Sequence, residues 1–174
     1  PRTSFDLEEF LQLASRRLGQ NWLALDYYLT NEALCVVMVA PDGCQTWSLP
    51  VSGQTRMALQ LMTRSRTAGE GLTRRPLKQL GTWLFPAWIQ ERLTPETYLI
   101  LSPHRQLHHL PWPALHLDDA PLASRCIPTV VPSLVNLALL WRRSPEPAAT
   151  RDGGLLLATS EFGGRYPPLP AVVQ

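Results

Sequence analysis

The first fifty residues carry two hydrophobic patterns, one typical of a helix and one typical of strands. Near the N-terminus, apolar residues recur at every third or fourth position, which is the spacing of one helix face. Asp6 followed by Glu9 matches a capping box, and Gly19 is a suitable helix stop. The pattern predicts a helix over residues 6–18, with an apolar face formed by Leu7, Phe10, Leu11, Ala14 and Leu18.

Three strands are predicted after this helix, because short apolar runs rich in β-branched and aromatic residues alternate with turn signals. Asn31 marks the first turn and Asp42-Gly43 marks the second. The segment 34–39 is apolar on both faces, which indicates a central strand. The predicted strands are residues 22–29, 33–40 and 44–49.

Two helical patterns and a polar stretch follow. The longer pattern runs from Leu77 to Ile89, with Pro76 at a favourable first-turn position and Pro86 expected to kink or split the helix. The stretch 64–75 contains glycine and many polar residues, so it is expected to be a surface loop. The shorter helical stripe before it consists of Met57, Ala58, Leu61 and Met62.

The segment 97–115 is the most informative part of the chain. It predicts a buried strand over 97–102, a tight turn, a short return strand, and a corner where Trp112 lies between two prolines. A strand at 126–131 follows, and Ser133 is a good N-cap for a helix with Leu134, Leu137, Ala138 and Trp141 on one face. The expected organisation is a subdomain over 1–144, a linker over 145–152, and the first strand and turn of a second subdomain over 153–174.

Composition narrows the classes of protein. The chain has 174 residues, of which 45% are hydrophobic and 17% charged, so it can bury a core and is not a disordered segment. A net charge of +2 gives no case for nucleic acid binding. No apolar run reaches the roughly 18 residues of a membrane span. There is no charged-then-apolar leader, and the expected location is the cytoplasm.

The three cysteines are an odd number, which argues against a disulfide scaffold and fits a reducing compartment. If Asp42-Gly43 is a two-residue hairpin loop, Pro41 faces Cys44, and Cys35 lies roughly 20 Å further along its strand. That separation is far beyond disulfide reach. All three cysteines, Cys126 included, are therefore expected to be buried small hydrophobes.

The order of these segments resembles the CHAT-domain family, relatives of caspases and separases. The most specific portion is Leu99 to Leu115 followed by Val131-Pro132-Ser133-Leu134, and the likeness extends over residues 6–174. His104-Arg105 stands where the family often has Asp-Gly. The resemblance implies an α/β fold, a caspase-like α/β/α sandwich, of which this chain is the N-terminal, pseudo-protease half plus the first strand of the catalytic half.

In the family, a cysteine thiolate activated by histidine attacks a peptide carbonyl. The segments that carry those two residues lie downstream of the matching region, so no catalytic residue can be transferred to this chain. We therefore assign no catalytic, cofactor-binding or metal-binding residue and no cofactor. The resemblance implies part of a cysteine endopeptidase of a bacterial regulatory or defence pathway, with the Cys/His dyad on a downstream segment or a second polypeptide of the same precursor.

The histidines and a cluster of basic residues are the other candidate sites in the sequence. A metal site needs three or four converging ligands. His108 and His109 would lie on opposite faces of a strand, so ordinary turn or surface histidines are the better interpretation. A basic cluster could bind RNA or an acidic partner, but a solvated loop is favoured. The histidines are His104, His108, His109 and His116, and the basic residues are Arg64, Arg66, Arg74, Arg75 and Lys78.

Two functions stay open, besides a generic α/β binding domain whose likeness to the family is due to chance. The first is the peptidase fragment, whose partners would be the downstream segment and a protein substrate. The second is a non-catalytic pseudo-caspase module that binds a sensor or regulates a partner protein. Neither hypothesis calls for a membrane, and nucleic acid is not an expected partner.

Overall fold

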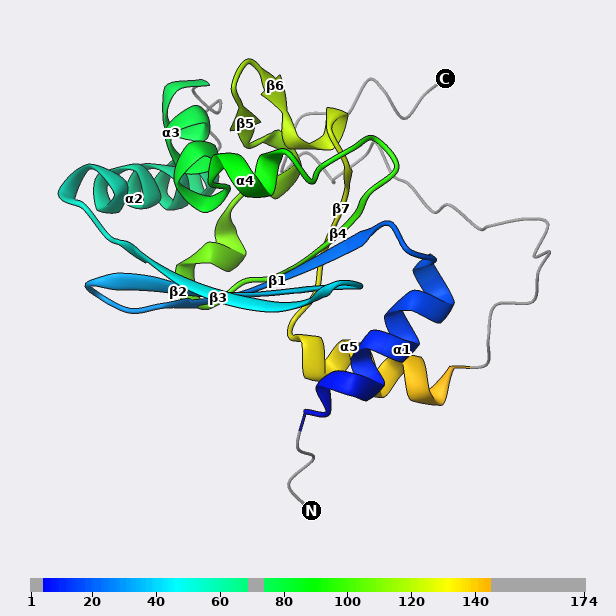
Figure 1. Ribbon diagram of the computed structural model, residues 1–174. Helices are drawn as coiled ribbons and strands as arrows, with labels where there is room; N and C mark the ends of the chain where they lie inside the picture. The colour runs from blue at the N-terminus through cyan, green and yellow to red at the C-terminus, as the bar shows by residue number, and fades with distance from the viewer. Residues whose placement is uncertain (1–4, 69–73, 145–174) are drawn as a thin grey trace, which may run out of the picture.

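The computed structural model describes residues 5–68 and 74–144, in which a five-stranded mixed sheet lies between two helical layers (Figure 1). The strand order is β3-β2-β1-β4-β7; β1, β2 and β3 form an antiparallel meander, whereas β4 is parallel to β1 and to β7. This confirms the predicted α/β sandwich. The strands are β1 (Trp22–Leu29), β2 (Ala33–Ala40), β3 (Gly43–Pro50), β4 (Tyr98–Ser102) and β7 (Ile127–Val130).

The turn between β2 and β3 is shifted by one residue from the prediction. Ala40 pairs with Gly43, so the two loop residues are Pro41 and Asp42, and Cys44 faces Val39 instead of Pro41. Proline is favoured at the second position of a turn and glycine at the fourth, which is the order found here. Gly43 has a φ of 132°, a value that residues with a side chain rarely adopt.

The lower helical layer consists of α1 (Leu7–Leu18) and α5 (Leu134–Arg143), both drawn below the sheet in Figure 1. Their predicted caps are confirmed: Asp6 Oδ1 accepts from the Glu9 amide, and Ser133 Oγ accepts from the Asn136 amide, each at 3.1 Å. Aromatic packing joins the layers, because the ring of Phe10 lies 5.6 Å from that of Trp141 and 6.0 Å from that of Trp22.

The upper layer contains α2 (Gly53–Ala68), α3 (Arg74–Leu84) and α4 (Ala87–Gln90). The predicted loop over 64–75 is wrong at both ends: α2 extends to Ala68, where arginine and alanine favour a helix, and α3 already begins at Arg74. The predicted stripe on α2 is also wrong in part. Ala58 and Met62 are buried with Leu59, whereas Met57 and Leu61 are exposed.

Pro86 splits the next helix as predicted, since it precedes α4 and cannot donate a backbone hydrogen bond. The apolar positions of the split helix are buried in the main core, among them Leu80, Leu84 and Ile89. Gly81 lies directly against the backbone of His116, and a Cβ atom added there would be 2.1 Å from the His116 carbonyl oxygen. The helix can approach this segment so closely only because residue 81 has no side chain.

The predicted short return strand after β4 is wrong. Because β7 is parallel to β4, the chain must cross over a face of the sheet before it can pair again. The crossover contains two short 3₁₀ helices, η1 (Arg105–His109) and η2 (Trp112–Ala114), then the small hairpin of β5 (His116–Leu117) with β6 (Ala120–Pro121), and then η3 (Leu122–Ser124). The predicted linker 145–152 and the predicted segment 153–174 lie outside the described residues.

Trp112 is buried, with its ring 5.3 Å from that of Tyr27 and 6.2 Å from that of Phe85, and its Nε1 donates to the Leu107 carbonyl at 3.1 Å. The proline corner therefore anchors the crossover to the core.

Candidate functional site

Two polar side chains meet at the last residue pair of the parallel strands β1 and β4, where β4 ends, toward the edge at which ligands bind in open α/β sheets. Asp26 pairs in register with Ser102, whose Oγ donates to Asp26 Oδ1 across 2.5 Å. A nucleophilic serine needs a base such as histidine to take its proton. Ser102 is instead 2% exposed and bonded to a carboxylate, so the pair joins two strands and is not an activated nucleophile.

His104 follows β4 and is held at the same edge. Its ring stacks on that of Tyr28 with centroids 4.4 Å apart, and its Nδ1 lies 3.2 Å from both the nitrogen and the carbonyl oxygen of Leu29. These contacts fasten the end of β4 to the end of β1. The imidazole of His104 does not act as the base of Ser102, because the Ser102 hydroxyl donates its proton to Asp26.

The other histidines do not converge with His104. His108 and His109 lie on η1, so the predicted placement on opposite faces of a strand is wrong. His116 Nδ1 is 3.0 Å from the Ala114 carbonyl. Over residues 5–68 and 74–144, no group of three or more His, Cys, Asp or Glu residues is arranged to hold a metal ion.

Cys126 is buried as predicted, one residue before β7, and its Sγ lies 3.6 Å from the Leu122 carbonyl. Burial raises the pKa of the Cys126 thiol to about 12, and the charge of Arg125 opposes this only in part. Since the thiolate is the reactive form, this thiol is inert at neutral pH.

Cys35 and Cys44 are exposed, which corrects the prediction that all cysteines are buried. Both lie on the lower face of the meander, where α1 and α5 cover Ala24 and Val39 but leave the far part of the sheet open. Tyr28, beside Cys35 in the register, is 57% exposed on this open face. A cavity of about 330 Å³ lies between the sheet and the lower helices, with mainly apolar walls to which Asp26 and Cys44 also contribute. It offers space for an apolar group but no pair of nucleophile and base.

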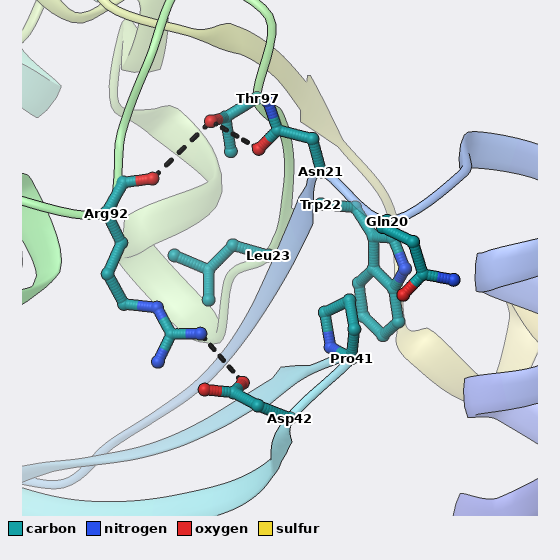
Figure 2. A pocket seen from close by; sticks show the side chains of 8 residues that line it. All are labelled: Gln20, Asn21, Trp22, Leu23, Pro41, Asp42, Arg92 and Thr97. Atoms are coloured by element: carbon teal, nitrogen blue, oxygen red, sulfur yellow. Dashed lines mark hydrogen bonds and ion pairs between the residues drawn. The ribbon is translucent and has the colours of Figure 1, made fainter.

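A second cavity, of about 240 Å³, lies beside the start of β1 and the β2–β3 turn (Figure 2). The guanidinium of Arg92 reaches across the cavity to Asp42, with Nη2 and Oδ1 2.7 Å apart. Figure 2 shows Leu23 between Arg92 and Trp22. The hydrogen bond from Arg92 holds the pKa of Asp42 below its usual value, against a smaller opposing effect of burial. The lining residues are Gln20, Asn21, Trp22, Leu23, Pro41, Asp42, Arg92 and Thr97.

Several polar groups of this second cavity are bonded to one another, whereas the buried Trp22 Nε1 has no hydrogen-bond partner among the described residues. Thr97 Oγ1 donates to Asn21 Oδ1 at 2.9 Å and lies 3.4 Å from the Arg92 carbonyl oxygen. Together with the Arg92–Asp42 pair, these bonds tie the segment after α4 to the start of β1 and to the β2–β3 turn. The bonded polar groups of this cavity therefore have a structural role.

The predicted basic cluster lies on helices. Arg74 Nη2 and Lys78 Nζ both contact Asp119 Oδ1, at 3.2 and 3.3 Å, so part of the cluster binds the β5–β6 hairpin. The sequence patterns missed the Asp26–Ser102 and Arg92–Asp42 pairs. A polar residue inside the apolar strand 22–29 was the one signal for Asp26, but its partner could be found only from the pairing of β1 with β4.

None of the helices in the described part of the chain combines the length and the apolarity that a membrane crossing demands.

A search of curated proteins found no match. The family model of the CHAT domain matches residues 74–174, which contain α3, the β4–η2 segment and the crossover to α5. Because that match covers more than half of the 174 residues, the chain belongs to the CHAT-domain family, a family of caspase-like peptidases.

Proposed function

We propose that this chain is the N-terminal part of a CHAT-type cysteine endopeptidase that cleaves a protein substrate in a bacterial regulatory or defence pathway. The CHAT match over residues 74–174 carries this proposal. The Cys/His dyad would come from a downstream segment or from a second polypeptide. The described cysteines support that division, since Cys126 is inert and neither Cys35 nor Cys44 has a hydrogen bond to a histidine among residues 5–68 and 74–144.

A second candidate is the non-catalytic pseudo-caspase module, and the outer edge of β7 favours it. The amides of Ile127 and Val131 bond to β4, at 2.8 Å each, so by alternation Pro128 and Val130 face outward. Proline has no N–H, and proline on an edge strand is a common device against further pairing. A continuous ladder on this edge would lack one of its donors. Over residues 5–68 and 74–144, β7 is an edge strand, and Pro128 disfavours further pairing there, as expected if no catalytic half continues this sheet.

Native and denaturing mass spectrometry of the protein purified from its source, after treatment with an electrophilic peptide probe, distinguishes the two functions. A second polypeptide that is bound natively, released on denaturation and labelled on cysteine supports the split peptidase. A longer single polypeptide labelled downstream of residue 174 supports it equally. A 19.5 kDa species without labelling overturns the peptidase and leaves the binding module. The matched control is the same peptide without its electrophile, which must label nothing.

A further inference from the structure

A groove of about 340 Å³ lies in the upper layer between α2 and α3, the two helices drawn furthest from α1 and α5 (Figure 1). Its apolar wall includes Met57 and Leu61, which are 64% and 45% exposed and lie one helical turn apart. Pro76 lines the opposite side. Single exposed apolar residues are ordinary, but two large ones that line one concave surface are typical of a binding site.

The core-facing side of α2 is formed by other residues. Ala58, Leu59 and Met62 already bury the inner face of α2. Met57 and Leu61 therefore contribute little to the core of this chain. Methionine is also flexible and adapts to irregular partners, which suits a surface that binds another side chain.

Arg75 is the one charged residue among the described residues that line the groove. The two helices contain no aspartate or glutamate. Arg75 lines the groove, is exposed, and forms no ion pair or hydrogen bond within the described residues. A wider hollow of about 630 Å³ shares Gln54, Arg75 and Gln79 with the groove. It continues to Arg74, Lys78 and Asp119, where both basic side chains pair with the Asp119 carboxylate, so Arg75 is the cation left for a partner. The basic residues of the two helices are Arg56, Arg64, Arg66, Arg74, Arg75 and Lys78.

We propose that the α2–α3 groove binds an acidic amphipathic helix of a partner protein. Apolar residues at helical spacing on that helix would pack against Met57 and Leu61, and a carboxylate beside them would pair with Arg75. The apolar wall favours a peptide over nucleic acid, whose backbone needs charge and whose unpaired bases need aromatic platforms. The groove has no aromatic lining residue. The inference holds for either function proposed above, because it uses none of the catalytic residues.

Fluorescence anisotropy with the full chain tests this. The probe is a labelled, hydrocarbon-stapled peptide of about 16 residues, or roughly four helical turns, with leucines along one face and glutamates flanking them. Leu61→Ser and Arg75→Glu should each weaken its binding about tenfold, the loss expected for one buried leucine or one charge contact. The matched controls, Leu140→Ser and Arg143→Glu on α5, exchange residues that are also exposed, in the opposite helical layer, and should leave binding unchanged.

A charge exchange separates binding from misfolding. A second peptide with lysine in place of glutamate should bind the Arg75→Glu variant better than it binds the unmodified chain, a gain that an unfolded variant could not give. The proposal is overturned if the acidic peptide fails to saturate, or if all four variants bind it alike. It is also overturned if a single-stranded RNA oligonucleotide binds through Arg75 while neither peptide does, because the partner would then be nucleic acid.

Discussion

Arg92 Nη2 donates to Asp42 Oδ1 across 2.7 Å, and this ion pair connects the segment after α4 to the β2–β3 turn fifty residues earlier in the chain. It lies at the rim of the cavity in Figure 2, beside the Thr97–Asn21 hydrogen bond. Two segments that are distant in sequence are thus held at one end of the sheet by charged and polar side chains.

The Arg92–Asp42 pair predicts a small dependence of stability on pH. The hydrogen bond from Arg92 lowers the pKa of Asp42, so the folded state favours the carboxylate. The resulting stability is present above the pKa of this carboxyl in the unfolded chain and is lost as the pH falls through its lower folded pKa. The Asp42 side chain is 64% exposed, so we expect only about 0.5 kcal/mol.

Urea denaturation of the wild type and of Asp42→Asn, from about pH 7 to about pH 3, measures this contribution. The wild type should be slightly more stable at neutral pH, and the two free energies of unfolding should converge in acid. A difference that stays constant over the range would show that the charge of Asp42 is not involved.

Gly81→Ala should destabilise the protein by about 3 kcal/mol, because the new Cβ would be 2.1 Å from the carbonyl oxygen of His116 and α3 would have to move. Gly53→Ala is the matched control, since nothing lies within 4 Å of its Cβ position and alanine favours a helix. Thermal unfolding of both variants decides the matter. Equal melting temperatures for the two would refute the close contact.

Trp112→Phe should cost about 2 kcal/mol of folding free energy, because it leaves a void beside Tyr27 and removes the hydrogen bond to the Leu107 carbonyl. Trp88→Phe provides the comparison, since Trp88 is 38% exposed and its loss should cost under about 1 kcal/mol. Chemical denaturation gives both values. If the Trp88 variant had the lower free energy of unfolding, the crossover would not be anchored by Trp112.

Thiol labelling should distinguish the cysteines. Cys35 and Cys44 are exposed and should react rapidly with a disulfide reagent at about pH 8. Cys126 should react only after unfolding, because a pKa of about 12 leaves roughly one thiolate in 10⁴ at that pH. Cys126→Ala should keep the fast phase and lose the slow one. Three rapid thiols in the folded wild type would contradict the burial of Cys126.

Local patterns predicted the local elements well. The caps at Asp6 and Ser133 and the split at Pro86 were found because each depends on a few adjacent residues whose chemistry determines the backbone. The meander was found for the same reason, apart from the one-residue shift at Pro41, where proline's preferred turn position decided the register.

Tertiary context determined what the patterns missed. Met57 and Leu61 have the spacing of a core stripe, yet the packing of α2 buries Leu59 and Met62 instead. The η1 segment was predicted as a short return strand, but the parallel pairing of β4 with β7 requires a crossover. The Asp26–Ser102 pair depends on a contact across 76 positions, which no single-sequence period reveals.

The mixed sheet also has a consequence for the order of folding. Its antiparallel half joins neighbouring segments, whereas the β1–β4 pair closes a loop that contains the whole upper helical layer. Hairpins form within about 1–10 μs, but a longer loop has a greater entropic barrier to closure. We expect pulse-labelled amides of β2 to gain protection before those of β4. The meander would then be the nucleus on which β4 and β7, the strands within the part matched to the CHAT domain, are assembled last.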